Sequence, residues 1–448
     1  MTRLRAVWDR MRGTYWAVPS AMAALSVVLS LVMIDVDQAL TAKFLSQLSW
    51  VYTGGPQGAR AVLSTIAASM ITVAGVTFSI TIVALTLASQ QFGPRLLRNF
   101  LRDLGNQITL GTFIATFLYC LLVLRTVRGT DDTRFVPHLA VTVGVVLAML
   151  SIGVLIFFIH HIATSIQASQ VIANVAGDLE GAIERLFPDR IGRGPGVEGG
   201  GRLAATSAPT FDDARTVTAR RAGYVQAVDI DRLLTVARRA DAVIRIDATP
   251  GRFVRTGSPL ASVVLAAEPT DDLDDSLRDV FLIGADRTGT QDVGFFINQL
   301  VELAVRALSP GINDPATART CIDRLEQALC LLASRRLPSP YRHDDDGVLR
   351  VVAAPVTFVG MLDLALTEVT RYGRSSVSVS SRVLEAIRDL APCVSAEDDR
   401  LALIRQAFFA GDRPADSFDH EMDRVAVAES YRAALAAIHD RLDSHYST

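Results

Sequence analysis

The sequence predicts an α-helical membrane protein with four transmembrane helices, followed by a mixed α+β, mainly helical, cytoplasmic domain that contains a small β-module. Three observations support this fold class. Half of the 448 residues are hydrophobic, and the mean hydropathy of +0.31 is high for a soluble protein. The apolar residues concentrate before residue 165, whereas charged residues become frequent after residue 175. The apolar part also contains long runs without any charge.

Four of these runs are long enough to cross a bilayer, at residues 16–34, 61–88, 108–124 and 139–159. None of them contains Asp, Glu, Lys, Arg or His. A spanning helix needs about 20 apolar residues, and backbone groups in hydrocarbon must bond to one another. We therefore expect four helices. The first run is too long for the apolar region of a cleaved signal peptide, and we interpret it as a retained span.

The cations that flank the runs predict the orientation. The tail before the first run and the loop after the second carry seven arginines, namely Arg3, Arg5, Arg10, Arg12, Arg95, Arg98 and Arg102. The two opposite loops carry five cations, namely Lys43, Arg60, Arg125, Arg128 and Arg134. Because cations accumulate on the cytoplasmic side, both termini are predicted to be cytoplasmic. All cations except Lys43 are arginines, which suggests a high-GC bacterial genome, so we expect the bacterial inner (plasma) membrane.

The pattern beyond the spans predicts four further segments. We expect a transmembrane domain over residues 1–165, a helical extension of the fourth span over 166–190 and a glycine-rich linker over 191–210. A small β-rich module should follow at 211–268, and a mainly helical domain at 269–448. A strand is expected near 348–354, and helices near 231–239, 292–308, 401–409 and 425–442.

Composition excludes several kinds of site. Lys43 is the only lysine, so the chain has no P-loop and no carrier lysine, although residues 250–260 resemble a lipoyl or biotinyl module. The four cysteines form no CxxC pair, so we expect free thiols, no disulfide framework and no metal site. A net charge of −3 implies no nucleic-acid partner. The sequence indicates no cofactor and no enzyme motif.

The second run carries a polar stripe. Its members recur at spacings of three, four and seven residues, which places them on one face of a helix. They are Thr65, Ser69, Thr72, Ser79, Thr86 and Gln90. Such a stripe can line a path for ions or small solutes, or it can pack helices together. Ser64, Thr77 and Thr81 lie off the stripe.

Two other segments are candidate sites. After Gly93-Pro94, which should end the second helix, Arg95, Arg98 and Arg102 alternate with apolar residues, as in an amphipathic helix at the membrane surface. The second segment comprises Ser309, Pro310, Gly311, Asn313, Asp314 and Pro315. It predicts a turn in which Asp314 caps a helix that begins at Pro315. A ligand pocket that includes Arg287, Asp292 and Asn313 is the alternative.

Two sequence motifs carry a resemblance to a known family. Residues 77–95 (TFSITIVALTLASQQFGPR) and 307–315 (ALSPGINDP) resemble the bacterial predicted-membrane-protein family called domain of unknown function 2254. The resemblance implies a multi-pass membrane protein, and it supplies no catalytic residues.

Two function classes remain open at this stage. The first is an oligomeric, channel-like conduit for ions or small solutes with a cytoplasmic regulatory domain. A single stripe cannot enclose a pore, so this hypothesis requires a homo-oligomer in which Thr72 and Ser79 face the axis or a neighbouring copy. The alternative is a membrane-anchored regulatory or scaffold protein, whose cytoplasmic domain binds a protein or a small effector.

Overall fold

The computed structural model describes residues 16–39, 52–92, 103–128, 135–165, 167–188, 209–265, 272–412 and 420–445. The chain divides into two compact units, residues 1–170 and 171–448. Each unit has its own core and is described by itself.

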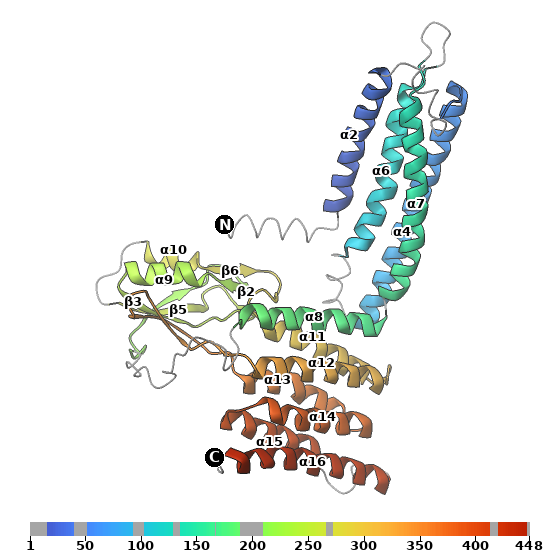
Figure 1. Cartoon of the computed structure of the whole chain (residues 1–448). Helices are drawn as coiled ribbons and strands as arrows, with labels where there is room; N and C mark the ends of the chain where they lie inside the picture. The colour runs from blue at the N-terminus through green and yellow to red at the C-terminus, as the bar shows by residue number, and fades with distance from the viewer. Residues whose placement is uncertain are drawn as a thin grey trace. The chain divides into compact units, whose positions relative to one another are not determined.

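The first unit consists of long apolar helices (Figure 1). They are α2 (Ala17–Ala39), α4 (Pro56–Phe92), α6 (Leu104–Thr126) and α7 (His138–Ser165). All four are long and apolar enough to cross a membrane, which confirms the expected spans. Helix α6 is central, because it contacts the other three and half of its span is buried, against 22 % in each of the others.

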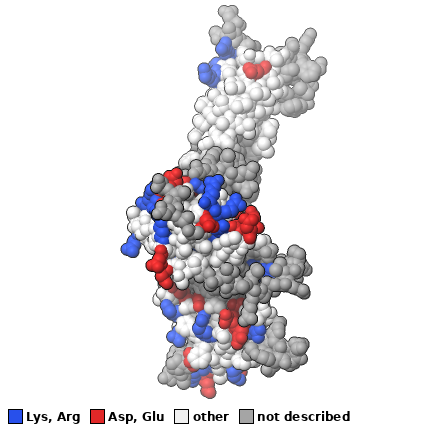
Figure 2. Space-filling view, turned by 90° about the vertical axis from the view of Figure 1, so that its left-hand side faces the viewer, with Lys and Arg blue, Asp and Glu red and all other residues white. Residues whose placement is uncertain are grey.

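The surface of these spans is almost free of charge along its length (Figure 2). Charged side chains gather at one end of the bundle and over the second unit. Inside the bundle, polar side chains join the helices: Thr116 Oγ1 lies 3.1 Å from Ser151 Oγ, and Tyr119 donates to the Ala140 carbonyl at 2.9 Å. Such hydrogen bonds hold helices together where the hydrophobic effect cannot.

The second unit begins with α8 (Ala168–Leu186). The expected extension of the fourth span over 166–190 is therefore a separate helix, since α7 ends at Ser165. Helix α8 is amphipathic and buries Val171, Val175 and Leu179 on one face. Its C-terminal end is held by Arg335, which donates to the Pro188 carbonyl at 3.1 Å and pairs with Glu184 at 3.2 Å. Most of the expected linker at 191–210 lies outside the described residues.

Two sheets follow α8. The strands are β1 (Arg215–Thr218), β2 (Gly223–Val228), β3 (Ala242–Ile246), β4 (Phe253–Val254), β5 (Pro259–Leu265), β6 (Phe281–Gly284), β7 (Tyr341–His343) and β8 (Leu349–Ala353). The larger sheet has the order β1-β5-β3-β8-β7, and the smaller has the order β4-β2-β6. All pairs are antiparallel except β3 with β8, where Ile244 lies opposite Val351.

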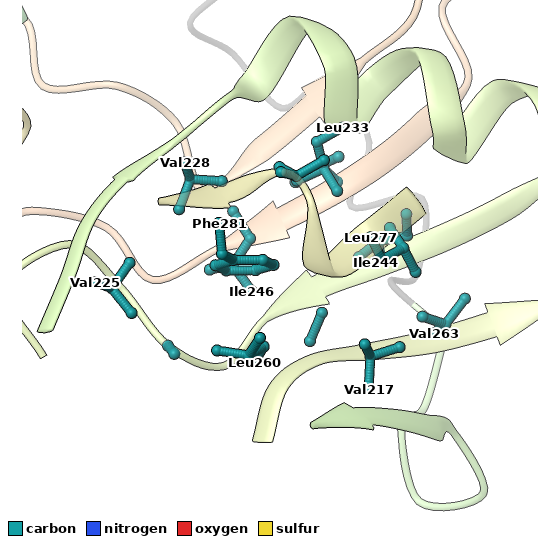
Figure 3. Packing of buried hydrophobic residues seen from close by; sticks show 14 of the residues in the cluster. Val217, Val225, Val228, Leu233, Ile244, Ile246, Leu260, Val263, Leu277 and Phe281 are labelled. Carbon is teal, nitrogen blue, oxygen red and sulfur yellow. The ribbon is translucent and has the colours of Figure 1, made fainter. Parts of the chain in front are cut away.

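The β-module is therefore not closed within residues 211–268, because β6, β7 and β8 come from later in the chain. Helices α9 (Ile230–Arg239) and α10 (Leu273–Arg278) lie in the same region. Leu233 and Leu277 from these helices are buried in one core with Ile244, Leu260 and Phe281 from the strands (Figure 3). The pairing of β3 with β8 joins segments more than 100 residues apart, which local sequence patterns do not reveal.

The rest of the second unit is a stack of helices. They are α11 (Val293–Ala307), α12 (Pro315–Ala333), α13 (Phe358–Tyr372), α14 (Val377–Leu390), η1 (Ala391–Cys393), α15 (Glu397–Gly411) and α16 (Glu421–His445). Helices α11, α13 and α15 form one row, and α12, α14 and α16 form the other (Figure 1). Each helical pair contacts the next, as in a short helical repeat array.

The cysteines of this stack correct an expectation. Cys330 on α12 and Cys393 in η1 form a disulfide, so the prediction of free thiols throughout the soluble part is wrong. Cys120 and Cys321 are free and buried. The pair was missed because 63 residues separate its members, and only the packing of α12 against α14 brings them together.

Candidate functional site

Helix α4 has two different faces. One face packs against α6 and α7, and its small and apolar residues are buried. Its members are Leu63, Ala67, Met70, Ala74, Thr77, Thr81 and Ala84. Thr77 and Thr81, which lie off the polar stripe, are therefore packing residues, and Thr81 donates to the Thr77 carbonyl at 2.8 Å.

The polar stripe lies on the other face. All of its members are exposed in the protomer, namely Thr65, Ser69, Thr72, Ser79, Thr86 and Gln90. At 3.6 residues per turn, this stripe is on the opposite side of the helix from the buried face. Within the described residues of the protomer, the stripe therefore lies away from the face that packs against α6 and α7.

The hydroxyls of the stripe are largely satisfied by the helix itself. Thr65, Ser69 and Thr72 each donate to the carbonyl four residues earlier, at 2.8 Å. Thr86 does the same at 2.9 Å. A hydroxyl bonded in this way can lie beside apolar groups without an unmet hydrogen bond, and its oxygen can still accept a bond from a solute or a neighbouring helix.

Small residues flank the stripe on the same face. Ala61, Ala68 and Gly75 recur every seventh position and are exposed. A Cβ atom added at Gly75 would meet no atom within 4 Å among the described residues. Small residues at regular helical spacing allow two helix backbones to approach closely in a membrane. At these three positions, no bulky side chain covers the backbone of α4.

The basic segment cannot be placed beside the stripe. Helix α4 ends at Phe92, as expected from Gly93-Pro94. Arg95, Arg98 and Arg102 lie outside the described residues.

A polar cluster that the sequence did not reveal begins at Asp103. This residue caps α6 by accepting from Gly105 N at 2.8 Å, and its other carboxylate oxygen lies 2.6 Å from His161 Nε2 on α7. Phe157 stacks on the His161 ring. Asp103 directly before an apolar run is an N-cap signal, whereas its contact with His161 depends on how α6 packs against α7. The pair thus joins the two helices at this end.

The segment from Ser309 to Pro315 is a turn. The Ser309 carbonyl accepts from Ile312 N and Asn313 N, and Asn313 has a positive φ of 48°. Asp314 caps α12 by accepting from Thr317 N at 3.1 Å and from Thr317 Oγ1 at 2.5 Å. These two bonds hold the pKa of Asp314 below its ordinary value. Pro315 is the first residue of α12, and Pro310 and Gly311 are exposed.

The alternative of a ligand pocket at this turn fails on distance. Arg287 pairs with Asp292 at 2.6 Å, just before α11, whereas Asn313 follows the end of that helix. A helix of 15 residues is about 22 Å long. Arg287 and Asp292 therefore cannot share a small-molecule pocket with Asn313, although all three are near one another in sequence.

The comparisons with known proteins agree with the membrane fold. The model of the family described as "Predicted membrane protein (DUF2254)" matches residues 12–389. The chain belongs to this family. It is also 32 % identical over 437 residues to an uncharacterized protein of Mycobacterium tuberculosis strain H37Rv and to one of Mycobacterium bovis. These matches cover 95 % of the chain and 81 % of each relative. No solved structure matches the chain.

Membership in domain of unknown function 2254 assigns no chemistry to the stripe or to the turn. The match begins before α2 and ends within α14, so it includes all four spans, both sheets and the beginning of the helical stack. A functional hypothesis must therefore come from the geometry of the chain.

Proposed function

We propose that the protein is a homo-oligomeric, channel-like conduit for ions or small solutes, with α4 of each copy near the symmetry axis. One observation carries this proposal: the polar stripe of α4 is exposed along its whole length, opposite the face that the protomer buries. A closed ring of copies would collect one such stripe from each, and an uncharged hydroxyl surface would then line the path.

The physical argument concerns where six polar side chains are stable in a membrane. In contact with lipid, the oxygen atoms of these side chains would accept no further hydrogen bond. A neighbouring helix or the water in a conduit can donate one to them. The small residues Ala61, Ala68 and Gly75 beside the stripe favour close contact between copies. The stripe and its small neighbours thus support self-association through one helix face.

We also propose that the protein lies in the bacterial plasma membrane with both termini in the cytoplasm. Four spans put both termini on one side, and the flanking arginines favour the cytoplasm. The disulfide between Cys330 and Cys393 favours an oxidising compartment instead. The arginines carry the orientation, because flanking charges act during insertion, whereas a reducing cytoplasm can open the disulfide that the structure shows between these two cysteines. The soluble unit would then act as the regulatory part.

The direct test is conductance. Purified full-length protein is reconstituted in planar bilayers, and the current is compared between the wild type, Thr72→Leu and Ser79→Leu. We expect discrete currents from the wild type and a large reduction in both variants, since leucine removes the hydroxyl and narrows the path. Ser64→Leu is the matched control, because Ser64 is an exposed serine of the same helix that lies off the stripe.

Cross-linking tests the oligomer separately from conduction. Cysteines introduced at positions 72 and 79 should form disulfide-linked dimers in membranes under mild oxidation, whereas one introduced at the exposed Leu150 of α7 should not. If position 150 cross-links and positions 72 and 79 do not, α4 faces lipid and the proposal is wrong.

The alternative function is a membrane-anchored regulatory or scaffold protein. The double row of helices favours it, because helical arrays commonly present extended protein-binding surfaces. Leu401 and Phe408 on α15 are more than half exposed. Two results together would favour the scaffold over the conduit. A photo-cross-linker at either position would capture one specific protein in cells, and the reconstituted protein would give no current in bilayers.

A further inference from the structure

A cavity of about 660 Å³ opens between α2 and α6 where these two helices end. This is the end of the span bundle away from the C-terminus of α7, because α2 and α6 run antiparallel to α4 and α7 in a chain that crosses four times. The lining of the cavity includes four apolar side chains and two guanidinium groups, namely Leu31, Ile34, Leu122, Phe135, Arg125 and Arg128, and three uncharged polar residues complete it. None of these residues belongs to the polar stripe of α4.

The two arginines carry positive charge that the described part of the chain does not neutralise. Within that part, no carboxylate forms an ion pair with Arg125 or Arg128. Asp37, on the adjacent turn of α2, is engaged elsewhere, because it accepts from Leu139 N and Ala140 N. Among the described residues that line the cavity, these two arginines are the only charged ones, so this part of the lining can take an anionic group.

The backbone around the arginines is fixed by hydrogen bonds. Arg128 and Phe135 pair across a short bridge, in which each residue donates its N–H to the carbonyl of the other, at 3.0 and 3.2 Å. Between the two arginines, the Val127 carbonyl accepts from Arg60 of α4 at 2.9 Å. Arg125 lies in the last turn of α6. The site is thus built on helix ends and a bridged loop.

The depth of the cavity in the membrane follows from the sequence of α6. Arg125 directly follows the uncharged run 108–124, so its guanidinium lies at the level of the lipid headgroups. The apolar residues of the lining come from the preceding turns of the spans, and Leu31 is 57 % exposed on the lipid-facing side. The cavity therefore extends from the headgroup region into the hydrocarbon.

We propose that this cavity binds an anionic phospholipid. Its phosphate would lie between Arg125 and Arg128, and the part of one acyl chain nearest the headgroup would lie along Leu31 and Leu122. Arginine forms paired, charge-assisted hydrogen bonds with phosphate oxygens. Two arginines that form no ion pair with a carboxylate of the described residues favour a headgroup of net negative charge over a zwitterionic one. Free phosphate would leave the apolar wall uncovered. The proposal holds for either orientation of the protein.

The test uses native mass spectrometry and thermal unfolding of delipidated full-length protein in detergent. The probes are dioleoyl phosphatidylglycerol, dioleoyl phosphatidylcholine and inorganic phosphate. We expect one phosphatidylglycerol to be retained per protomer and to raise the unfolding temperature. In the double variant Arg125→Gln/Arg128→Gln, its apparent affinity should fall about tenfold or more, because charge-assisted bonds are lost.

A second variant and a control keep the result interpretable. Leu31→Trp should fill part of the cavity from an exposed position and should also weaken retention, while leaving both arginines in place. The double variant Arg239→Gln/Arg255→Gln removes the same charge from exposed sites in the second unit and should bind like the wild type.

Three outcomes would overturn the proposal. Equal retention of phosphatidylcholine would show that charge is not recognised. Equal stabilisation by inorganic phosphate would assign the site to a soluble anion rather than a lipid. Unchanged phosphatidylglycerol binding in both the arginine variant and Leu31→Trp would place the lipid elsewhere.

Discussion

The carboxylate of Asp37 on α2 accepts a hydrogen bond from the backbone N–H of Ala140 at 2.8 Å, and a second from Leu139 at 2.9 Å. Both N–H groups belong to the first turn of α7, where no carbonyl of the same helix is available. Asp37 therefore caps a helix that begins about 100 residues later in the chain. The N-terminus of a helix also favours a negative charge, so the contact joins two spans at one membrane surface.

We expect Asp37→Ala to lower the stability of the span bundle by about 1–3 kcal/mol, because one buried and one partly buried N–H group lose their acceptor. Asp35→Ala is the matched control, since Asp35 is exposed on the same turn of α2. Unfolding of the purified protein in mixed detergent micelles measures the difference. Equal stability of the two variants would contradict a capping role for Asp37.

The spans could be predicted from sequence because their cause is local. Long uncharged runs have one favourable environment, and the structure extends the four expected runs by only a few residues at most of their ends. Asp314 could be predicted as a helix cap for the same reason, since the cap and Pro315 are adjacent. The polar stripe of α4 could also be predicted, from the spacing of its residues. Its exposure could not, because the sequence does not specify which face of α4 packs against other helices.

The structural features that could not be predicted from the sequence depend on contacts between segments that are distant along the chain. The parallel pairing of β3 with β8 extends the β-module beyond residue 268, and the Cys330–Cys393 disulfide joins residues 63 positions apart. The pairing of Asp103 with His161 crosses two helices. Residue types alone do not specify such partners when no alignment reveals covariation.

Gly75 provides a test of the α4 face that leaves the protomer intact. A Cβ atom added at this exposed position meets nothing within 4 Å, so we expect Gly75→Leu to leave the bundle folded and to raise the helix propensity of α4 by about 1 kcal/mol. In the proposed homo-oligomer, however, the leucine would hold the α4 backbones of neighbouring copies apart. If the proposal holds, this oligomer should dissociate, which light scattering of the detergent-solubilised protein would detect.

Gly153 on α7 offers the matched control for Gly75. It is also exposed, and a Cβ atom added there likewise meets no atom within 4 Å. Gly153→Leu should therefore keep the oligomer of the wild type. Dissociation by both variants, or by neither, would argue against self-association through α4.

The cap at Asp314 predicts a dependence of stability on acid. Bonds from the Thr317 side chain and backbone lower the pKa of Asp314 from its ordinary value of 3.8. The folded state thus favours the ionised carboxylate, so its stabilisation is complete above about pH 4 and is lost as the pH falls through the lowered pKa. Asp314→Ala should cost about 0.5–2 kcal/mol at pH 7, with a smaller difference from the wild type at low pH.

Thermal unfolding at a series of pH values measures the role of Asp314. Asp345→Ala is the control, because its side chain is 97 % exposed, and this variant should behave like the wild type at every pH. A cost for Asp314→Ala that stays constant down to pH 2 would show that the ionised cap is not the source of the stability.

The disulfide between Cys330 and Cys393 should stabilise the helical stack when it is oxidised. Closing a loop of this length contributes up to about 4 kcal/mol by restricting the unfolded chain. We expect Cys330→Ser and dithiothreitol to lower the unfolding temperature of the second unit by similar amounts, and dithiothreitol to have no further effect on the variant. Cys321→Ala is the control, since Cys321 is buried and unpaired and should leave the response to dithiothreitol unchanged.

The same pair of cysteines reports the orientation in living cells. With the second unit in the cytoplasm, Cys330 and Cys393 should be largely reduced, so a membrane-permeant maleimide should label them and an impermeant maleimide should not. An oxidised pair in cells whose cytoplasmic thiols are reduced would place the second unit on the opposite side of the membrane. That result would reverse the proposed orientation without affecting the four spans, because the span number fixes only that both termini share one side.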